Sequence, residues 1–262
     1  MRTEARSHTG VGPALEWLER FSEVTADGAV PPLLSFEDHT PGQGQYRDVE
    51  QFRAAIDPDT LDPGETVDDA VARVIDEAEQ SRHLRTVNRA ALADLAQAGR
   101  ILLLAHDCED APDVEEAHDA GASVAEFPLS VGAARRARER GMTVVMGAPN
   151  ALRGGSHSGN VAAADLVRTG LCDALASDYL PSTMLAAAFH LARSGACTLH
   201  DAVSLVTSGP AAVTGLRDRG RVAPGARADL ILVDDARSWP QVVAVRSCAD
   251  RVTAAAHTGA MA

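Results

Sequence analysis

Three short apolar runs in this sequence are followed by residues that can bind a metal ion. The residues are His39, His106 and Asp178, which follow the runs 33–36, 101–105 and 173–176. Imidazole nitrogen and carboxylate oxygen suit zinc, iron or manganese, and such a site can keep one position open for water. A single His after a strand is more often structural, so the prediction of a metal site depends on three residues sharing one position in the fold.

A second candidate site is the stretch Thr143–Asn160, TVVMGAPNALRGGSHSGN. Its apolar start stops at Gly147 and the rest is rich in Gly, Ser and Asn, which predicts a buried strand that runs into a long polar loop. Gly154 and Gly155 permit backbone angles that other residues avoid, so their N–H groups can face an anion. Arg153 has a planar guanidinium suited to phosphate. The alternative is a Gly-rich turn on the surface.

The order of apolar runs and helical patterns indicates which elements position these residues. From residue 1 to about 210 the pattern is strand, loop and helix, repeated, which predicts a parallel sheet with crossover helices. In a β/α barrel the carboxyl ends of all strands open on one face, so residues distant in sequence converge there. The predicted strands are 33–36, 101–105, 123–127, 143–146 and 173–176, and the predicted helices are 14–24, two within 67–99, 114–120, 131–140, 161–168, 184–193 and 199–207.

The sequence changes character after residue 216. The segment from Arg217, RDRGRVAPGARADLILVDDA, has closely spaced turns and β-branched residues, and the β-branched residues continue through Gln241–Arg246. This pattern predicts the short strands of a small β unit. We therefore expect an α/β domain over residues 1–216 and a small β-rich segment over residues 217–262.

Composition excludes several classes of protein. The 262 residues are 45% hydrophobic, and the formal net charge of −13 argues against nucleic acid or an anionic membrane as partner. All 24 basic residues are Arg, which excludes a Schiff-base lysine, a P-loop lysine and a carboxylated lysine that bridges metals. The four cysteines show no C-x-x-C spacing, no signal peptide is visible, and no apolar run could span a bilayer. We therefore expect a cytoplasmic protein with reduced thiols.

Several motifs, taken in order along the chain, resemble one known family. They are DHTPGQGQYRD from Asp38, AHDCED from Ala105, EFPLS from Glu126, VVMGAPNALRGGSHSGN from Val144 and ASDYLPSTML from Ala176. These segments resemble the PhnM family, the amidohydrolase-superfamily diphosphatases of the phosphonate C–P lyase pathway. The segment GRVAPGARADLILVD also resembles the return of amidohydrolases to their small β-sandwich.

The resemblance implies a partial, distorted TIM-type (β/α) barrel that holds one or two divalent ions, zinc, manganese or iron. The metal ligands that it implies are Glu4, His39, His106 and Asp178. The opening Arg2-Thr3-Glu4 is similar to the family's R-x-E at the end of barrel strand four, where Glu replaces a carboxylated lysine. The other three ligands then follow strands five, six and eight. Four further residues are reserve ligands, which would bind metal if one of the first four does not: Asp107, Cys108, Glu126 and His157. If they bind no metal, Asp107 is a supporting carboxylate and Cys108 is a buried thiol. Glu126 then caps the end of its strand, and His157 makes hydrogen bonds within the loop.

The resemblance also has two gaps. The chain starts where barrel strand four should end, and strands one to three, the first-strand ligands and the leading half of the β-sandwich have no counterpart. The sequence has one more strand candidate than barrel positions four to eight, so either 123–127 or 143–147 is expected to be misassigned. Two alternatives for the function stay open: a deaminase or cyclic amidohydrolase on the same scaffold, and an inactive remnant.

The function that the resemblance implies is cleavage of α-D-ribose 1-methylphosphonate 5-triphosphate to the 5-phosphate and diphosphate. Asp178 would take a proton from a water molecule whose pKa the metal lowers. Arg153, Gly154 and Gly155 would hold the phosphates of this small-molecule partner. Hydrogen bonds to phosphate or ribose oxygens would come from Ser156, His157 and Asn160. Whether the chain forms a homo-oligomer is left open.

Overall fold

A parallel sheet is the frame of the structure, a computed structural model. Its strands are β1 (Arg2–Arg6), β2 (Leu33–Glu37), β3 (Leu102–His106), β4 (Ala122–Glu126), β5 (Thr143–Gly147) and β6 (Ala174–Ala176), and they lie side by side in this order. The structure describes residues 2–6, 30–37, 41–42, 46, 48–80, 82–155, 160–237, 239–248 and 252–254, with the backbone alone for 2–6, 82 and 252–254. Within these ranges the main sheet has six strands.

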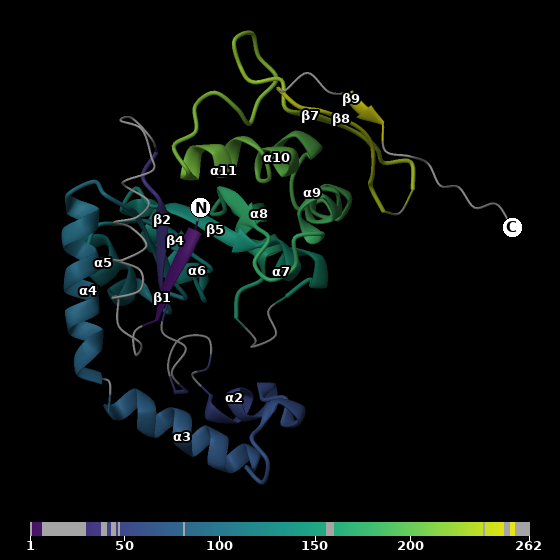
Figure 1. Cartoon of the computed structure of the whole chain (residues 1–262). Helices are drawn as coiled ribbons and strands as arrows, with labels where there is room; N and C mark the ends of the chain where they lie inside the picture. The colour runs from purple at the N-terminus through teal and green to yellow at the C-terminus, as the bar shows by residue number, and fades with distance from the viewer. Residues whose placement is uncertain are drawn as a thin grey trace, which may run out of the picture.

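Helices connect successive strands of the sheet from β2 to β6, and three more of the described helices follow β6 (Figure 1). They are α2 (Val49–Ala55), α3 (Val67–Gln80), α4 (Arg82–Gln97), α5 (Ala111–Asp119), α6 (Val131–Glu139), α7 (Ala148–Arg153), α8 (Ala163–Arg168), α9 (Thr183–Arg193), α10 (Leu199–Ser204) and α11 (Ser208–Val213), with a 3₁₀ turn at Pro58–Thr60. Most predicted helices are confirmed, although the one expected at 199–207 ends at Ser204 and the one expected at 14–24 lies outside the described residues. None of the helices in the described ranges is long and apolar enough to cross a membrane.

The strands present two faces, because successive side chains of a strand point to opposite sides. One face, the helix face, packs against α4 to α9 in the main hydrophobic core, and its side chains include Leu34, Leu103, Ala105, Ala125, Val144, Met146 and Leu175. The opposite face, the polar face, has a small apolar cluster of Leu104, Val124, Val145 and Ala174. The same alternation places Ser35, Glu37, His106 and Glu126 on the polar face, at the carboxyl ends of β2, β3 and β4.

The predicted α/β class is confirmed, and six adjacent parallel strands with crossover helices are consistent with part of a TIM-type barrel. The expectation that either 123–127 or 143–147 is misassigned is wrong, because β4 and β5 are both strands of this sheet. These two strands separate β3 from β6, whereas barrel positions six and eight are separated by one strand. If Asp178 follows strand eight, His106 therefore ends strand five rather than strand six.

The segment after β5 also differs from its prediction, because it forms helix α7 where a long loop was expected. Pro149 lies in the first turn, where its missing N–H leaves no helical hydrogen bond unmade. Gly154 ends the helix with a left-handed φ of 78°. The Asn150 side chain then fixes the return of the chain, since its Oδ1 accepts from Ala163 N at 2.8 Å and its Nδ2 donates to Val161 O at 3.3 Å.

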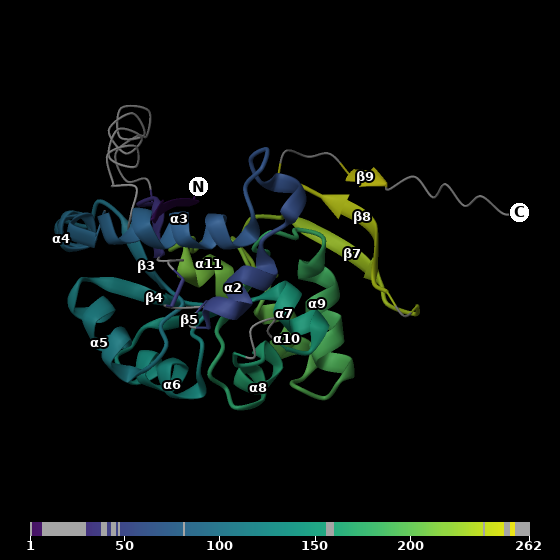
Figure 2. The ribbon, with the colours of Figure 1, turned by 90° about the horizontal axis from the view of Figure 1, so that it is seen from below.

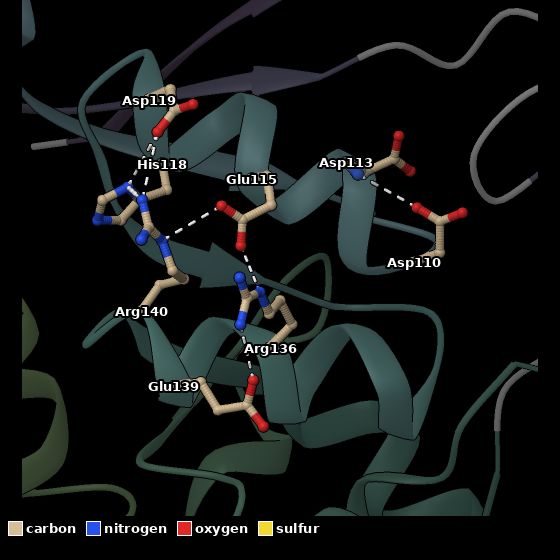
Figure 3. A network of polar contacts seen from close by, with 8 residues as sticks. All are labelled: Asp110, Asp113, Glu115, His118, Asp119, Arg136, Glu139 and Arg140. Carbon is tan, nitrogen blue, oxygen red and sulfur yellow. Dashed lines mark hydrogen bonds and ion pairs between the residues drawn. The ribbon is translucent and has the colours of Figure 1, made fainter.

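Helices α5 and α6 are neighbours (Figure 2), and an ionic network joins them (Figure 3). Arg136 pairs with Glu115 of α5 and with Glu139 of its own helix, the latter at 3.0 Å. Arg140 lies 3.4 Å from Glu115 and 2.9 Å from His118 Nδ1. These side chains are partly exposed, so each pair stabilises the fold by roughly 0–1 kcal/mol. The network orients the two helices that pack beside β4.

A second, antiparallel sheet follows in the C-terminal part of the chain (Figure 1). The small β unit expected there is confirmed, and its strands are β7 (Leu230–Asp234), β8 (Gln241–Arg246) and β9 (Val252–Ala254). Arg193 of α9 ties this sheet to the main body, because its Nη2 donates to the carbonyls of Asp235 at 2.7 Å and Arg237 at 3.0 Å. Ile231 and Leu232 of β7 are 54% and 63% exposed. The boundary at residue 216 stays a prediction.

Candidate functional site

The carboxyl ends of the parallel strands bring predicted ligands to one edge of the sheet. His106 is the last residue of β3, and Asp178 lies two residues beyond β6. Glu4 is in β1 with its backbone in register with Ser35, but the structure does not describe its side chain. His39, shortly after β2, lies outside the described residues. Two of the four predicted ligands are thus placed at this edge with their side chains.

His106 is almost fully buried at the end of the polar face. Its side chain is 8% exposed, and its Nδ1 lies 3.0 Å from Oδ2 of Asp107. The Phe127 ring stands edge-on to the imidazole, with the ring centroids 5.1 Å apart. Burial by itself lowers the pKa of His106, but Asp107, Glu126 and Glu37 outweigh it and raise the pKa to about 9. The surroundings of His106 therefore favour a positive charge.

Two buried carboxylates share the polar face with His106. Glu37 and Glu126 are 3% and 1% exposed, and Glu126 is in register with His106 across β3 and β4. Ser35 Oγ donates to Oε2 of Glu126 at 2.6 Å. Buried carboxylates are costly unless positive charge lies near, so a cation at this edge would stabilise them. Sequence analysis predicts Glu126 as a reserve ligand but does not single out Glu37. Side chains of β2 alternate between the two faces of the sheet, so Glu37 lies on the same face as Ser35.

A cavity of about 680 Å³ lies on the polar face, and both Glu126 and Asp178 line it. Imidazole and carboxylate donors at this edge fit zinc, manganese or iron by type. Among the side chains that the structure describes, however, no three His, Cys, Asp or Glu lie close enough together to hold an ion. Glu4 and His39 are not among those side chains. The four-residue metal site therefore stays a prediction.

Backbone strain gathers at the same edge of the sheet. Apart from glycine, the described residues with a left-handed backbone are Asp107, Phe127 and Asp178, at φ values of 56°, 53° and 50°. Each follows a strand of the main sheet within two residues. Such a conformation costs on the order of 1–3 kcal/mol, and it tends to persist at functional sites. The strain therefore points to the same edge as the predicted ligands.

Arg153, the predicted phosphate ligand, lies at the exposed end of α7. Its Nη1 donates to the hydroxyl of Tyr179 at 2.7 Å. Tyr179 directly follows Asp178, so the hydrogen bond links Arg153 to the segment after β6 that contains the proposed catalytic carboxylate. Of the other residues predicted to bind substrate, Asn160 lies shortly before α8, and Ser156 and His157 lie outside the described residues.

The N–H groups of the glycines in this segment bond to the backbone of α7. The N–H groups of Gly154 and Gly155 both donate to the carbonyl of Asn150, at 3.2 and 3.3 Å. These hydrogen bonds satisfy a carbonyl at the carboxyl end of α7, as the N–H groups of glycines after a helix commonly do. In the structure these N–H groups therefore already have a partner, and the roles of Gly154, Gly155 and Arg153 in phosphate binding stay predictions.

The reserve ligand Cys108 belongs to the helix face rather than to the site. It packs in the main core at 6% exposure, and burial raises the pKa of its thiol to about 12. Burial raises the pKa of Cys172 to about 12 in the same way. Because a thiol binds metal as the thiolate, the buried-thiol alternative for Cys108 is supported. All four cysteines are free, as expected for a cytoplasmic protein, although that location stays a prediction.

The chain is similar in sequence to a diphosphatase. Over 236 residues it is 41% identical to alpha-D-ribose 1-methylphosphonate 5-triphosphate diphosphatase of Escherichia coli (strain K12), which confirms the resemblance found in the motifs. The alignment covers 88% of this chain and 59% of that protein. The chain thus spans about three fifths of the length of this curated relative.

The fold and the family are shown by two further similarities. The crystal structure of N-acetylglucosamine-6-phosphate deacetylase from Pasteurella multocida shares the fold with a TM-score of 0.54 at 11% identity, over 96% of this chain and 75% of that one. A model of the amidohydrolase family matches residues 65–258. Because that match covers most of the sequence, the chain belongs to the amidohydrolase family.

Proposed function

We propose that this chain is a metal-dependent diphosphatase that cleaves α-D-ribose 1-methylphosphonate 5-triphosphate to the 5-phosphate and diphosphate. The observation that carries the proposal is the 41% identity, over 236 residues, to the E. coli enzyme of that name. The chemistry of the strand ends supports it. A buried imidazole and buried carboxylates lie at the edge that also holds Asp178, and Arg153 is hydrogen-bonded to Tyr179, the residue after Asp178.

We assign the metal site to residues that follow the strands of the main sheet. The proposed ligands are Glu4, His39, His106 and Asp178. Glu37, Asp107 and Glu126 all favour positive charge at His106, which supports binding of a cation at this position. One or two divalent ions, zinc, manganese or iron, would lower the pKa of a bound water and polarise a phosphoryl oxygen.

The side chains of this chain would supply the remaining steps. Asp178 accepts the proton that water loses as its oxygen attacks phosphorus at the anhydride next to the 5-phosphate. The bond from that phosphorus to the bridging oxygen breaks, and diphosphate leaves. Arg153 binds phosphate oxygens with its planar guanidinium, which offsets repulsion between a polyanionic substrate and a protein of net charge −13. Tyr179, the residue after Asp178, accepts a hydrogen bond from that guanidinium.

The test is ³¹P NMR of the substrate with protein loaded with zinc, manganese or iron, and with the E. coli enzyme as positive control. Equal amounts of diphosphate and 5-phosphate are expected. If the folded, metal-loaded chain releases no diphosphate while the control turns over, the proposal is wrong. A panel of purines and cyclic amides tests the alternatives, since ammonia release or ring opening would assign a deaminase or a cyclic amidohydrolase. Inactivity on every substrate would support the alternative that the chain is an inactive remnant.

A further inference from the structure

Phe127 lies where the alternation of β4 would not put it. Ala125 is on the helix face, so a regular strand would direct residue 127 to the same side. Instead the backbone turns left-handed at Phe127, with φ of 53°, and the ring joins the apolar cluster of the polar face. An aromatic side chain rarely adopts this conformation, which costs on the order of 1–3 kcal/mol. The surrounding structure must therefore hold Phe127 in place.

Hydrogen bonds across three strands hold this turn. Phe127 N–H donates to the carbonyl of Val145 in β5 at 2.9 Å, and Leu129 N–H donates to the carbonyl of Cys108 at 2.9 Å. On the other side, Asp107 N–H donates to the carbonyl of Glu126 at 2.9 Å. The turns after β3 and β4 thus support each other, which makes the position of the Phe127 ring a fixed property of the fold.

The ring fills the space between His106 and β5. Its centroid lies 5.1 Å from that of the imidazole, at an interplanar angle of 80°, which is the edge-to-face arrangement that aromatic rings prefer. Toward β5 it approaches the backbone, since a Cβ added to Gly147 would lie 3.9 Å from Cε1 of Phe127. The imidazole is therefore flanked by this ring, while its Nδ1 lies 3.0 Å from Oδ2 of Asp107.

We propose that Phe127 is a positioning residue for His106. Its ring restricts the imidazole to one orientation, and the strained turn after β4 is kept because it places the ring there. The metal-binding part of this inference rests on the proposed function, in which His106 is a ligand. Residues that orient a metal-binding His change metal affinity by roughly ten- to a hundredfold when they are replaced. Phe127 would orient His106 by packing its ring against the imidazole, whereas most residues that orient a metal-binding His do so by a hydrogen bond.

The test compares variants that keep or remove the ring. Phe127→Leu removes it and stays apolar, Phe127→Tyr keeps it, and Phe189→Leu makes the same change at a buried Phe of α9 as a matched control. Zinc affinity is measured by competition with a chelator, alongside thermal unfolding. Phe127→Leu should bind zinc about ten- to a hundredfold more weakly, whereas Phe127→Tyr and Phe189→Leu should stay within about threefold of the parent. A change within about twofold for Phe127→Leu would overturn the proposal.

A second measurement needs no metal and so separates this inference from the proposed function. NMR of the metal-free protein follows the imidazole carbon-bound protons of His106. In the parent they should show ring-current shifts and nuclear Overhauser contacts with Phe127, and in Phe127→Leu they should report an average over more than one side-chain rotamer. If the parent binds no zinc, the metal site fails while this measurement still decides the role of Phe127. A single unchanged imidazole rotamer in Phe127→Leu contradicts the proposal.

Discussion

The two faces of the main sheet are buried equally deeply but contain opposite chemistry. On the helix face, Leu34 and Val144 are fully buried among other apolar side chains, many of them Ala. On the polar face, Glu37 and Glu126 are buried to a similar degree beside His106. An apolar contact stabilises wherever it excludes water, whereas a buried charge depends on its partners. The apolar contacts of the helix face therefore contribute stability that is independent of protonation, and the polar face provides reactive groups at a cost in stability.

The largest effect is expected for His106→Ala in the metal-free protein at pH 6. Removal of the imidazole leaves Glu37, Asp107 and Glu126 without the positive charge that they favour. Loss of one partner of a buried ionic cluster costs about 3–5 kcal/mol. Urea unfolding measures the loss, and His190→Ala, an exposed His on α9, is the control. A loss of unfolding free energy below about 1 kcal/mol would show that the stability of the polar face does not depend on the positive charge of His106.

The same variant should show a dependence on pH that identifies its cause. The folded pKa of His106 is about 9, raised from 6.5, so its contribution is fully present below pH 6.5 and is lost as the pH rises through 9. The difference in unfolding free energy between the parent and His106→Ala should therefore shrink between pH 6.5 and 9. A difference that stays constant over this range would remove the electrostatic explanation.

Leu34→Ala on the helix face is the matching change. Leu34 is fully buried in the main core, and truncation to Ala leaves a cavity that costs about 2–5 kcal/mol. Because no titrating group takes part, the loss should be the same at pH 6.5 and pH 9. If Leu34→Ala and His106→Ala showed the same pH dependence in urea unfolding, the contrast between the faces would be wrong.

Arg153→Ala tests the proposed phosphate contact of Arg153, which is exposed at the end of α7. A charge-assisted phosphate contact is worth about 1.5–3 kcal/mol, so kcat/KM for the triphosphate should fall roughly ten- to a hundredfold. Unfolding and metal content should not change, because the side chain is exposed. Arg135→Ala, an exposed Arg of α6, should leave kcat/KM unchanged. A change under about twofold in Arg153→Ala would show that Arg153 makes no phosphate contact that matters for turnover.

The smallest effect concerns the thiols of the helix face at alkaline pH. Cys108 and Cys172 have folded pKa values of about 12, raised from 9.0, so their stabilising contribution is present below pH 9 and is lost between pH 9 and 12. Each thiol accounts for at most about 1.4 kcal/mol per pH unit in that range. Urea unfolding of the reduced protein at pH 8.5 and 10 measures how steeply the unfolding free energy falls with pH. The fall should be smaller in Cys108→Ala than in the parent, and an equal fall would show that Cys108 ionises in the folded state.

The sequence predicted the fold better than the site. Short continuous apolar runs predicted the strands from β2 to β6, because strands of a parallel sheet are buried on both faces and such runs can be recognised without tertiary information. Glu37 is polar and follows the apolar run 33–36, so the run gave no sign that its side chain is buried. Phe127 is the last residue of the predicted strand 123–127, but an apolar run does not reveal its left-handed backbone. The orientation of a ring after such a turn depends on contacts with other strands, which a local pattern does not contain.

The segment after β5 shows a second limit of local patterns. Gly154 and Gly155 were expected to present N–H groups to an anion, because glycine permits the required angles. Conformational freedom does not determine which acceptor an N–H group meets, and here both meet the carbonyl of Asn150. Pro149 could have indicated helix α7, since proline is common in the first turn of a helix.

The exposed C-terminal sheet has a practical consequence for handling the protein. Ile231, Leu232 and Trp239 lie more than half exposed on or beside β7 and β8. Such side chains adsorb to phenyl resins and to plastic, and high concentrations of sulfate strengthen this adsorption. The net charge of −13 keeps molecules apart at low ionic strength, and salt screens that repulsion. Buffers of low ionic strength are therefore the conditions in which this chain should store and concentrate best.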